Sequence, residues 1–320
     1  MSIRRIIGFA AGLALLAGPV VAQEARQLVI GTGGTGGVYY PLGGGLASLI
    51  GKEIPNTQAT AQVTGASVDN LKLVAAGKAD IGFTQVDAAW DALKGQGKFA
   101  APLPVRALAV LYPNNLHAVT VDGTGITKIE DLRGKRVSVG STGSATEVFA
   151  VRVLEAAGID ADKDITKERL GAAESVNAMK DRKIDAFFWV GGLPTAAITD
   201  LAATPNTKIK FLDVDQFADK MNAKYGPLYA KATIPMATYK GMDADARNLT
   251  VWNILAVNEG MPDDLAYQLT KLVFEKSADL GQVHAEGRNI RLESQSTSRA
   301  GIPFHKGSLK YLAEKGVKVE

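Results

Sequence analysis

The chain of 320 residues has no cysteine and only three histidines. Without cysteine it can form no disulfide, no zinc–thiolate site and no lipid-modified cysteine after an export leader. His117, His284 and His305 are far apart, and none lies in an H-x₃-H or H-E-x-x-H pattern, so we expect no metal site. No serine occupies a G-x-S-x-G nucleophile elbow. Because no catalytic constellation is found, we expect the protein not to be an enzyme.

An excess of charge of either sign is also lacking. Of the 36 Lys and Arg residues, two lie in the first five positions, which leaves 34 against 33 Asp and Glu. This balance argues against nucleic acid as a partner. After residue 22 no apolar run reaches the roughly 20 residues that a membrane-spanning helix needs. We therefore expect a mature protein that is free of the membrane.

The first 22 residues have the plan of a secretory signal peptide. Arg4 and Arg5 precede an apolar block at 6–17, and small residues end at Ala22. The block is about 12 residues long, which is short for a membrane anchor. We predict cleavage after Ala22 and a periplasmic mature protein that begins at Gln23.

A glycine-rich stretch at 31–36, GTGGTG, matches the dinucleotide fingerprint G-x-G-x-x-G between a strand-like and a helix-like run. A dinucleotide site also needs an acidic residue about 20 positions on, at the end of the second strand. Glu53 precedes that strand, and residues 54–67 contain no acid. We therefore expect no cofactor here.

Strand-like and helix-like runs alternate along the mature chain in two groups, which predicts an α/β fold with a parallel or mixed sheet. Strands are expected at 28–32, 57–64, 79–85, 105–112, 116–121, 135–140, 185–190 and 209–214, and helices at 38–50, 67–76, 86–94, 145–157, 174–181 and 195–203. We interpret Tyr112-Pro113 as a turn between the groups. This pattern predicts two lobes joined by short crossing segments.

Four loops at predicted carboxyl ends of strands begin helices: 31–40, 64–70, 84–87 and 140–147. Glycine lets the backbone approach a ligand, and a helix start adds unpaired N–H groups with partial positive charge. No Arg or Lys is expected beside these loops. Together they predict a site for carboxylate or phosphate oxygens.

The chain resembles the solute-binding proteins of TRAP transporters, in the TAXI subfamily (TRAP-associated extracytoplasmic immunogenic proteins). The resemblance rests on residues 30–47, 64–87, 111–119, 129–147, 183–198 and 304–316, of which the first and fourth segments are the most diagnostic. It implies a type II periplasmic-binding-protein fold, whose two lobes close over a small organic acid such as a dicarboxylate, an oxo acid or a glutamate-like amino acid. It also implies delivery to a membrane TRAP permease driven by an ion gradient. By match of motif position, the ligand-binding residues would be Thr35, Gly36, Gly37, Tyr39, Ser67, Asn70, Gln85, Asp87, Ser141, Gly143, Ser144 and Thr146.

Three small departures from the family pattern leave the ligand's identity open: Asn114 stands where an acid is common, and Lys306 and Ser308 stand where Pro and Ala are common. We expect a monomer with one lobe from 23–112 and about 251–320, and another from about 113–250. The hinge would lie at 111–116 and in a return segment within 230–255. Two alternatives stay open: a periplasmic sensor that presents its ligand to a membrane receptor, and an exported α/β enzyme.

Overall fold

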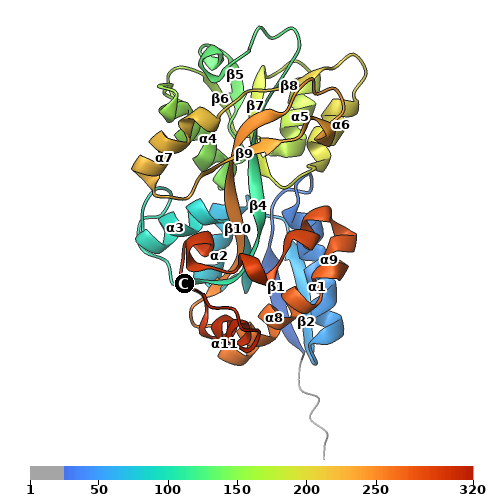
Figure 1. Cartoon of the computed structure of the whole chain (residues 1–320), viewed down its shortest axis with the longest axis vertical. Helices are drawn as coiled ribbons and strands as arrows, with labels where there is room; N and C mark the ends of the chain where they lie inside the picture. The colour runs from blue at the N-terminus through green and yellow to red at the C-terminus, as the bar shows by residue number, and fades with distance from the viewer. Residues whose placement is uncertain (1–24, 320) are drawn as a thin grey trace, which may run out of the picture.

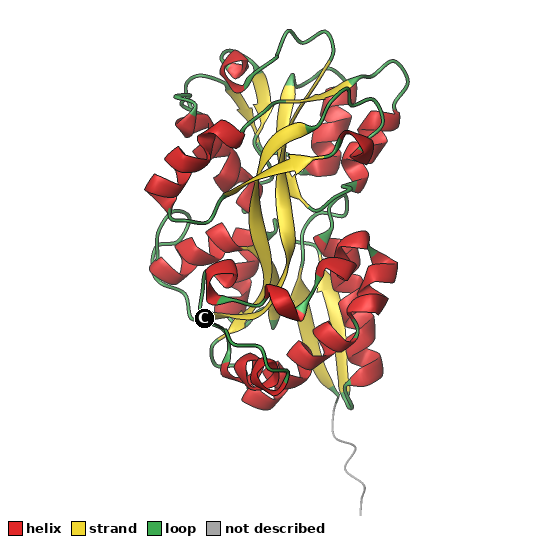
Figure 2. Ribbon diagram, in the orientation of Figure 1, coloured by secondary structure: helices red, strands yellow, loops and turns green. Residues whose placement is uncertain are grey.

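A computed structural model describes residues 25–319, so the predicted signal peptide lies outside the described residues. Within them the chain forms a mixed sheet of ten strands with helices on both sides (Figures 1 and 2). Eight strands follow the order β2-β1-β3-β10-β4-β7-β5-β6, while β8 pairs with β4 and β9 pairs with β10. The α/β fold class is as predicted.

The lower half of the molecule in Figure 1 contains the first group of elements. They are β1 (Arg26–Gly31), α1 (Tyr39–Glu53), β2 (Thr57–Gln62), α2 (Ser67–Ala75), β3 (Ile81–Gln85) and α3 (Val86–Lys94). β1 pairs in parallel with both β2 and β3. Every residue of β3 is buried, including the polar Thr84 and Gln85 at its carboxyl end.

The upper half contains the second group, in which β5 pairs in parallel with β6 and β7. Its elements are β5 (Arg136–Ser138), α4 (Ala145–Ala156), β6 (Thr166–Glu168), α5 (Ala172–Lys180), β7 (Ala186–Gly191), α6 (Ala196–Ala203), β8 (Ile209–Phe211), α7 (Ala218–Tyr225) and β9 (Ala230–Ile234). The carboxyl ends of β5 and β7 therefore point the same way. A separate apolar cluster, with Phe187, Ile198 and Leu201 fully buried, lies under α5 and α6.

Two long strands, β4 (Val105–Val121) and β10 (Ala246–Asn258), run antiparallel through both halves. The predicted turn at Tyr112-Pro113 is wrong, because β4 continues through it. Proline has no N–H to donate, and the register between β4 and β10 shifts between Trp252 and Ile254, next to the pair of Trp252 with Pro113. The proline is thus accommodated by an irregular ladder and does not end the strand.

The chain ends with four helices in the lower half, the first two of which pack against α1. They are α8 (Asp263–Glu275), α9 (Ser277–Val283), α10 (Thr297–Ala300) and α11 (Lys306–Glu314). Short 3₁₀ helices are η1 (Ile129–Leu132), η2 (Asp215–Phe217), η3 (Met236–Thr238), η4 (Ala285–Asn289) and η5 (Leu292–Ser294). In residues 25–319 we find no helix with the length and apolar character needed to cross a bilayer. The lobe boundaries given above stay a prediction.

Candidate ligand-binding cavity

A cavity of about 340 Å³ lies where the lower and upper halves meet. The lower half contributes the glycine-rich loop after β1, the loop after β2, and the ends of β3 and of the lower part of β4. The upper half contributes the loop after β5, the segment before α5 and the end of β7. The wall residues are Gly33, Gly34, Thr35, Gly36, Gly37, Val38, Tyr39, Val63, Thr64, Ala66, Ser67, Gln85, Tyr112, Asn114, Ser141, Ser144, Ala145, Thr146, Arg169, Leu170, Gly171, Ala172, Ala173, Glu174, Trp189 and Val190.

Four helices begin in this wall. The first residues of α1, α2, α4 and α5 are Tyr39, Ser67, Ala145 and Ala172, and all four line the cavity. The first turn of each helix has N–H groups without intrahelical partners and carries partial positive charge. Helix starts from both halves therefore surround one small volume, and their combined field favours an anion there.

The structure places nine of the twelve predicted site residues in the wall: Thr35, Gly36, Gly37, Tyr39, Ser67, Gln85, Ser141, Ser144 and Thr146. Gly37 is held close to the upper half, because a Cβ atom there would lie 2.9 Å from the Trp189 ring. The glycine-rich loop thus lets a side chain of β7 pack directly against its backbone.

Asn70, Asp87 and Gly143 are not among the wall residues. The amide of Asn70 is fully used within the lower half: Nδ2 donates to the carbonyls of Thr32 (2.6 Å) and Phe83 (2.8 Å), and Oδ1 accepts from Thr64 Oγ1 (2.7 Å). This side chain joins the loops after β1 and β2 to strand β3, and both N–H groups of its amide are used within the lower half. Its role is to shape the wall.

Gly143 connects the two halves directly. Its carbonyl accepts hydrogen bonds from the N–H groups of Val68 (3.0 Å) and Asp69 (3.1 Å) in the first turn of α2. A Cβ at Gly143, whose φ is +80°, would lie 2.3 Å from the Asp69 carboxylate. Two backbone N–H groups of the predicted loop 64–70 are therefore bonded to the opposite half.

A cationic side chain lies in the wall although none of the four predicted loops contains Arg or Lys, because it comes from a further segment of the upper half. Arg169 lines the cavity, and its Nε donates to Glu147 Oε1 at 3.0 Å. Its terminal nitrogens make no hydrogen bond within residues 25–319. Sequence reasoning missed Arg169 because β6, which ends one residue earlier, has only three residues, Thr-Lys-Glu, and no apolar run. The rule that polar residues follow strand ends would have identified it had this strand been recognised.

A polar region forms the deep wall around Asn253, where β3, β10 and β4 meet. Asn253 Nδ2 donates to the Tyr112 carbonyl at 3.0 Å, and Asn253 Oδ1 accepts from the Tyr39 hydroxyl and from Asn114 Nδ2. Burial raises the pKa of the Tyr112 hydroxyl well above its ordinary value, so this group stays protonated. We call Gln85, Tyr112 and Asn114 the cavity floor.

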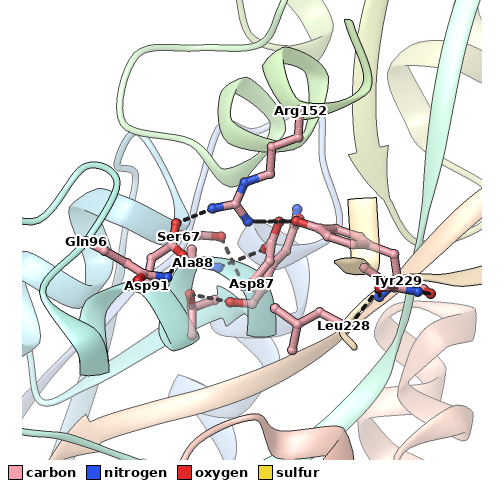
Figure 3. Close-up of polar contacts among 11 residues, drawn as sticks. Ser67, Asp87, Ala88, Asp91, Gln96, Arg152, Leu228 and Tyr229 are labelled. Atoms are coloured by element: carbon pink, nitrogen blue, oxygen red, sulfur yellow. Dashed lines mark hydrogen bonds and ion pairs between the residues drawn. The ribbon is translucent and has the colours of Figure 1, made fainter. Parts of the chain in front are cut away.

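A buried charged cluster joins the halves beside the cavity (Figure 3). Arg152 on α4 donates to Asp91 on α3 at 2.5 Å and to the Tyr229 hydroxyl at 2.7 Å, and that hydroxyl donates to Asp87 at 3.0 Å. Burial raises the pKa of Asp87 to about 6; Arg152 lowers it, and Asp91 adds to the rise. Asp87, predicted as a ligand-binding residue, is here bonded to Tyr229 and to the Ala88 N–H.

The arrangement is an α/β sheet in two halves with a cavity between strand ends of both. Residues 30–316 match the NMT1-like family, and the chain belongs to that family. It is similar in structure to a binding protein component of an ABC phosphonate transporter from Pseudomonas aeruginosa, with a TM-score of 0.53, 11% identity, and coverage of 82% of this chain and 79% of that one. It is also similar to the periplasmic aliphatic sulphonate binding protein from Escherichia coli, with a TM-score of 0.47, 15% identity, and coverage of 92% and 80%. At such identities the likeness concerns the fold alone, so the ligands of these proteins are not assigned to this chain.

Proposed function

We propose that this protein is an extracytoplasmic solute-binding protein that captures a small organic anion and delivers it to a membrane transporter. The observation that supports this most directly is the cavity between the halves, into which helices of both halves begin and Arg169 reaches. A site built from two halves can enclose its ligand when the halves approach each other. That enclosure gives a transporter a shape by which to distinguish loaded from empty protein.

The available donors are sufficient for useful affinity. A hydrogen bond to a charged group contributes roughly 1.5–3 kcal/mol. Four or five of them, less the free energy of ordering, give a binding free energy of about −8 kcal/mol, which corresponds to a micromolar Kd. Donors in the wall include the hydroxyl of Thr35, the backbone of the glycine-rich loop and the guanidinium of Arg169. The cavity volume of about 340 Å³ is large enough to hold a small organic acid.

For the transporter, we propose a TRAP permease, on the strength of the sequence resemblance to the TAXI subfamily. The ABC phosphonate transporter component named above shares the fold only, so it does not indicate the partner of this chain. Uptake by membrane vesicles that contain the candidate permease would separate the two: a sodium or proton gradient should drive uptake in the presence of this protein. Uptake that needs ATP and ignores the gradient would instead favour an ABC partner.

The test of binding is a calorimetric titration after a thermal-shift screen of carboxylates, sulfonates and phosphonates, because a ligand of the folded state raises the unfolding temperature. We expect at least one acid to bind with a micromolar Kd, and Arg169→Met to weaken it about tenfold by removing one charged hydrogen bond. The matched control is Arg133→Met, since Arg133 is half-exposed and pairs with Asp164 in the upper half, outside the wall. If no acid binds, or if both variants bind like the wild type, the proposed anion site is wrong.

A further inference from the structure

The cavity floor contains three buried polar atoms without a hydrogen-bond partner in residues 25–319. They are Gln85 Oε1, Tyr112 OH and Asn114 Oδ1, and the three side chains are at most 3% exposed. A buried polar atom left unpaired is destabilising, so each such atom in a folded protein calls for a partner, whether water or a bound molecule. Because all three line the cavity, they share one source of partners.

The hydrogen-bond network fixes which atom of Asn114 is left without a partner in the described residues. Asn253 Nδ2 donates to the Tyr112 carbonyl, so Asn253 Oδ1 must be the acceptor on the other side of that amide. Asn114 can then bond to Asn253 only through its NH₂ group, which it does at 2.8 Å. The remaining oxygen, Asn114 Oδ1, is an acceptor and cannot be exchanged for a donor by turning the amide over.

The other two floor groups are held near this acceptor by the sheet. Gln85 is the direct cross-strand partner of Asn253, and side chains of directly paired residues lie on the same face. Tyr112 and Asn114 flank Pro113 on β4, beside the register shift, and both line the same cavity. The floor therefore combines a fixed acceptor, an amide and a hydroxyl, whereas the helix starts and Arg169 supply donors elsewhere in the wall.

We infer that the ligand is an organic anion that also carries an O–H or N–H donor, and that this donor binds Asn114 Oδ1 with support from Gln85 and Tyr112. The inference rests on the proposed function and adds a requirement on the ligand. An acid without a donor would displace water from the floor and leave the Asn114 acceptor unpaired. The floor thus selects among acids that share one carbon skeleton.

The test compares acids with one skeleton and different substituents: succinate with malate and aspartate, and glutarate with 2-hydroxyglutarate and glutamate. We expect the hydroxyl- or ammonium-bearing member of the better-binding set to have a Kd at least tenfold lower than the unsubstituted acid. Comparison of the hydroxyl-bearing acids with the ammonium-bearing acids identifies which donor the floor prefers. Equal binding of substituted and unsubstituted acids would overturn the inference and leave the proposed function intact, whereas no binding by any acid would contradict both.

Two variants assign the effect to the floor. Asn114→Leu should raise the Kd of the donor-bearing acid about tenfold and leave the Kd of the unsubstituted acid within threefold. Tyr112→Phe removes a hydroxyl with no partner in the described residues, so it should weaken the same acid without lowering the unfolding temperature. The control is Val63→Ala, an exposed wall residue outside the floor. If Asn114→Leu and Tyr112→Phe both fold and both retain the wild-type ratio of Kd values, the floor does not select the ligand.

Discussion

Replacing Arg152 by methionine removes the only cation within the buried cluster that joins α3 and α4, as far as residues 25–319 show. The Arg152 and Asp91 side chains are 8% and 2% exposed. Methionine retains most of the apolar stem but leaves Asp91 charged and buried with Gln96 Nε2 as its remaining hydrogen-bond donor. Breaking one side of a buried ion pair is destabilising by about 3–5 kcal/mol.

Where this loss is measured depends on the movement of the halves. In the proposed open form α3 and α4 separate, and water can solvate Asp91, so the destabilisation falls on the closed form. Since about 1.36 kcal/mol corresponds to a tenfold change, ligand affinity should fall by between two and four orders of magnitude. The assay is the calorimetric Kd of the best-binding acid, together with the unfolding temperature of the ligand-free protein.

The double variant Asp91→Asn with Arg152→Met tests the physical reason. It removes both charges of the closest pair, and Asp87, which also loses its cation, keeps the Tyr229 hydroxyl and the Ala88 N–H as hydrogen-bond donors. Affinity should therefore recover to within about tenfold of the wild type. Arg133→Met is again the control for the loss of an exposed arginine. A single Arg152→Met variant with wild-type Kd and a lowered unfolding temperature would refute the reasoning, because the pair would then stabilise the fold and not its closure.

Two further predictions concern stability. The pKa of Asp87 is raised from 3.8 to about 6, so the folded state binds more protons between these values, and this stabilising contribution is lost as the pH rises from about 4 to 6. Asp87→Asn should therefore be more stable than the wild type at pH 7, and its free energy of unfolding, measured by urea denaturation, should decline less over pH 4–7. Parallel curves of unfolding free energy against pH for the two proteins would contradict the assignment. Ala66 has φ +84° and ψ −140°, a region that glycine adopts far more readily, so Ala66→Gly should raise the free energy of unfolding by about 1 kcal/mol. Ala76→Gly, at an ordinary φ of −84°, should lower it, and the same sign for both would show that Ala66 is not strained.

The sequence allowed much of the fold to be predicted where apolar periodicity is strong. The helices α3 and α4 and the strands β3 and β7 lie within two residues of their predicted bounds. The unbroken β4 could not be foreseen, because the effect of Pro113 depends on the irregular pairing with β10, which is far away in the sequence. The strand β10 was not predicted as a strand, and β6 is too short and polar to give a signal.

The candidate site was predictable at the level of loops and less so at the level of side chains. The glycine-rich loop after β1 and the loop after β5 reach the cavity, since strand ends and helix starts determine their position. Whether Asp87 faces the cavity or α4 depends on the rotation of α3 about its own axis, which only tertiary packing decides. Asn114 in the floor is similar: its role follows from contacts with Asn253, which is 139 residues away.

The continuity of β4 and β10 has a mechanical consequence. β4 and β10 cross from one half to the other as a paired ribbon. The hydrogen bonds between them resist sliding of one strand along the other, whereas the ribbon can still twist and bend. The ladder is weakest near Pro113 and between Trp252 and Ile254, where the register shifts, so bending should concentrate there. The range and stiffness of opening would then be set by these few residues and not by the ligand site. Evolution could therefore retune the speed of ligand release without altering which ligand is bound.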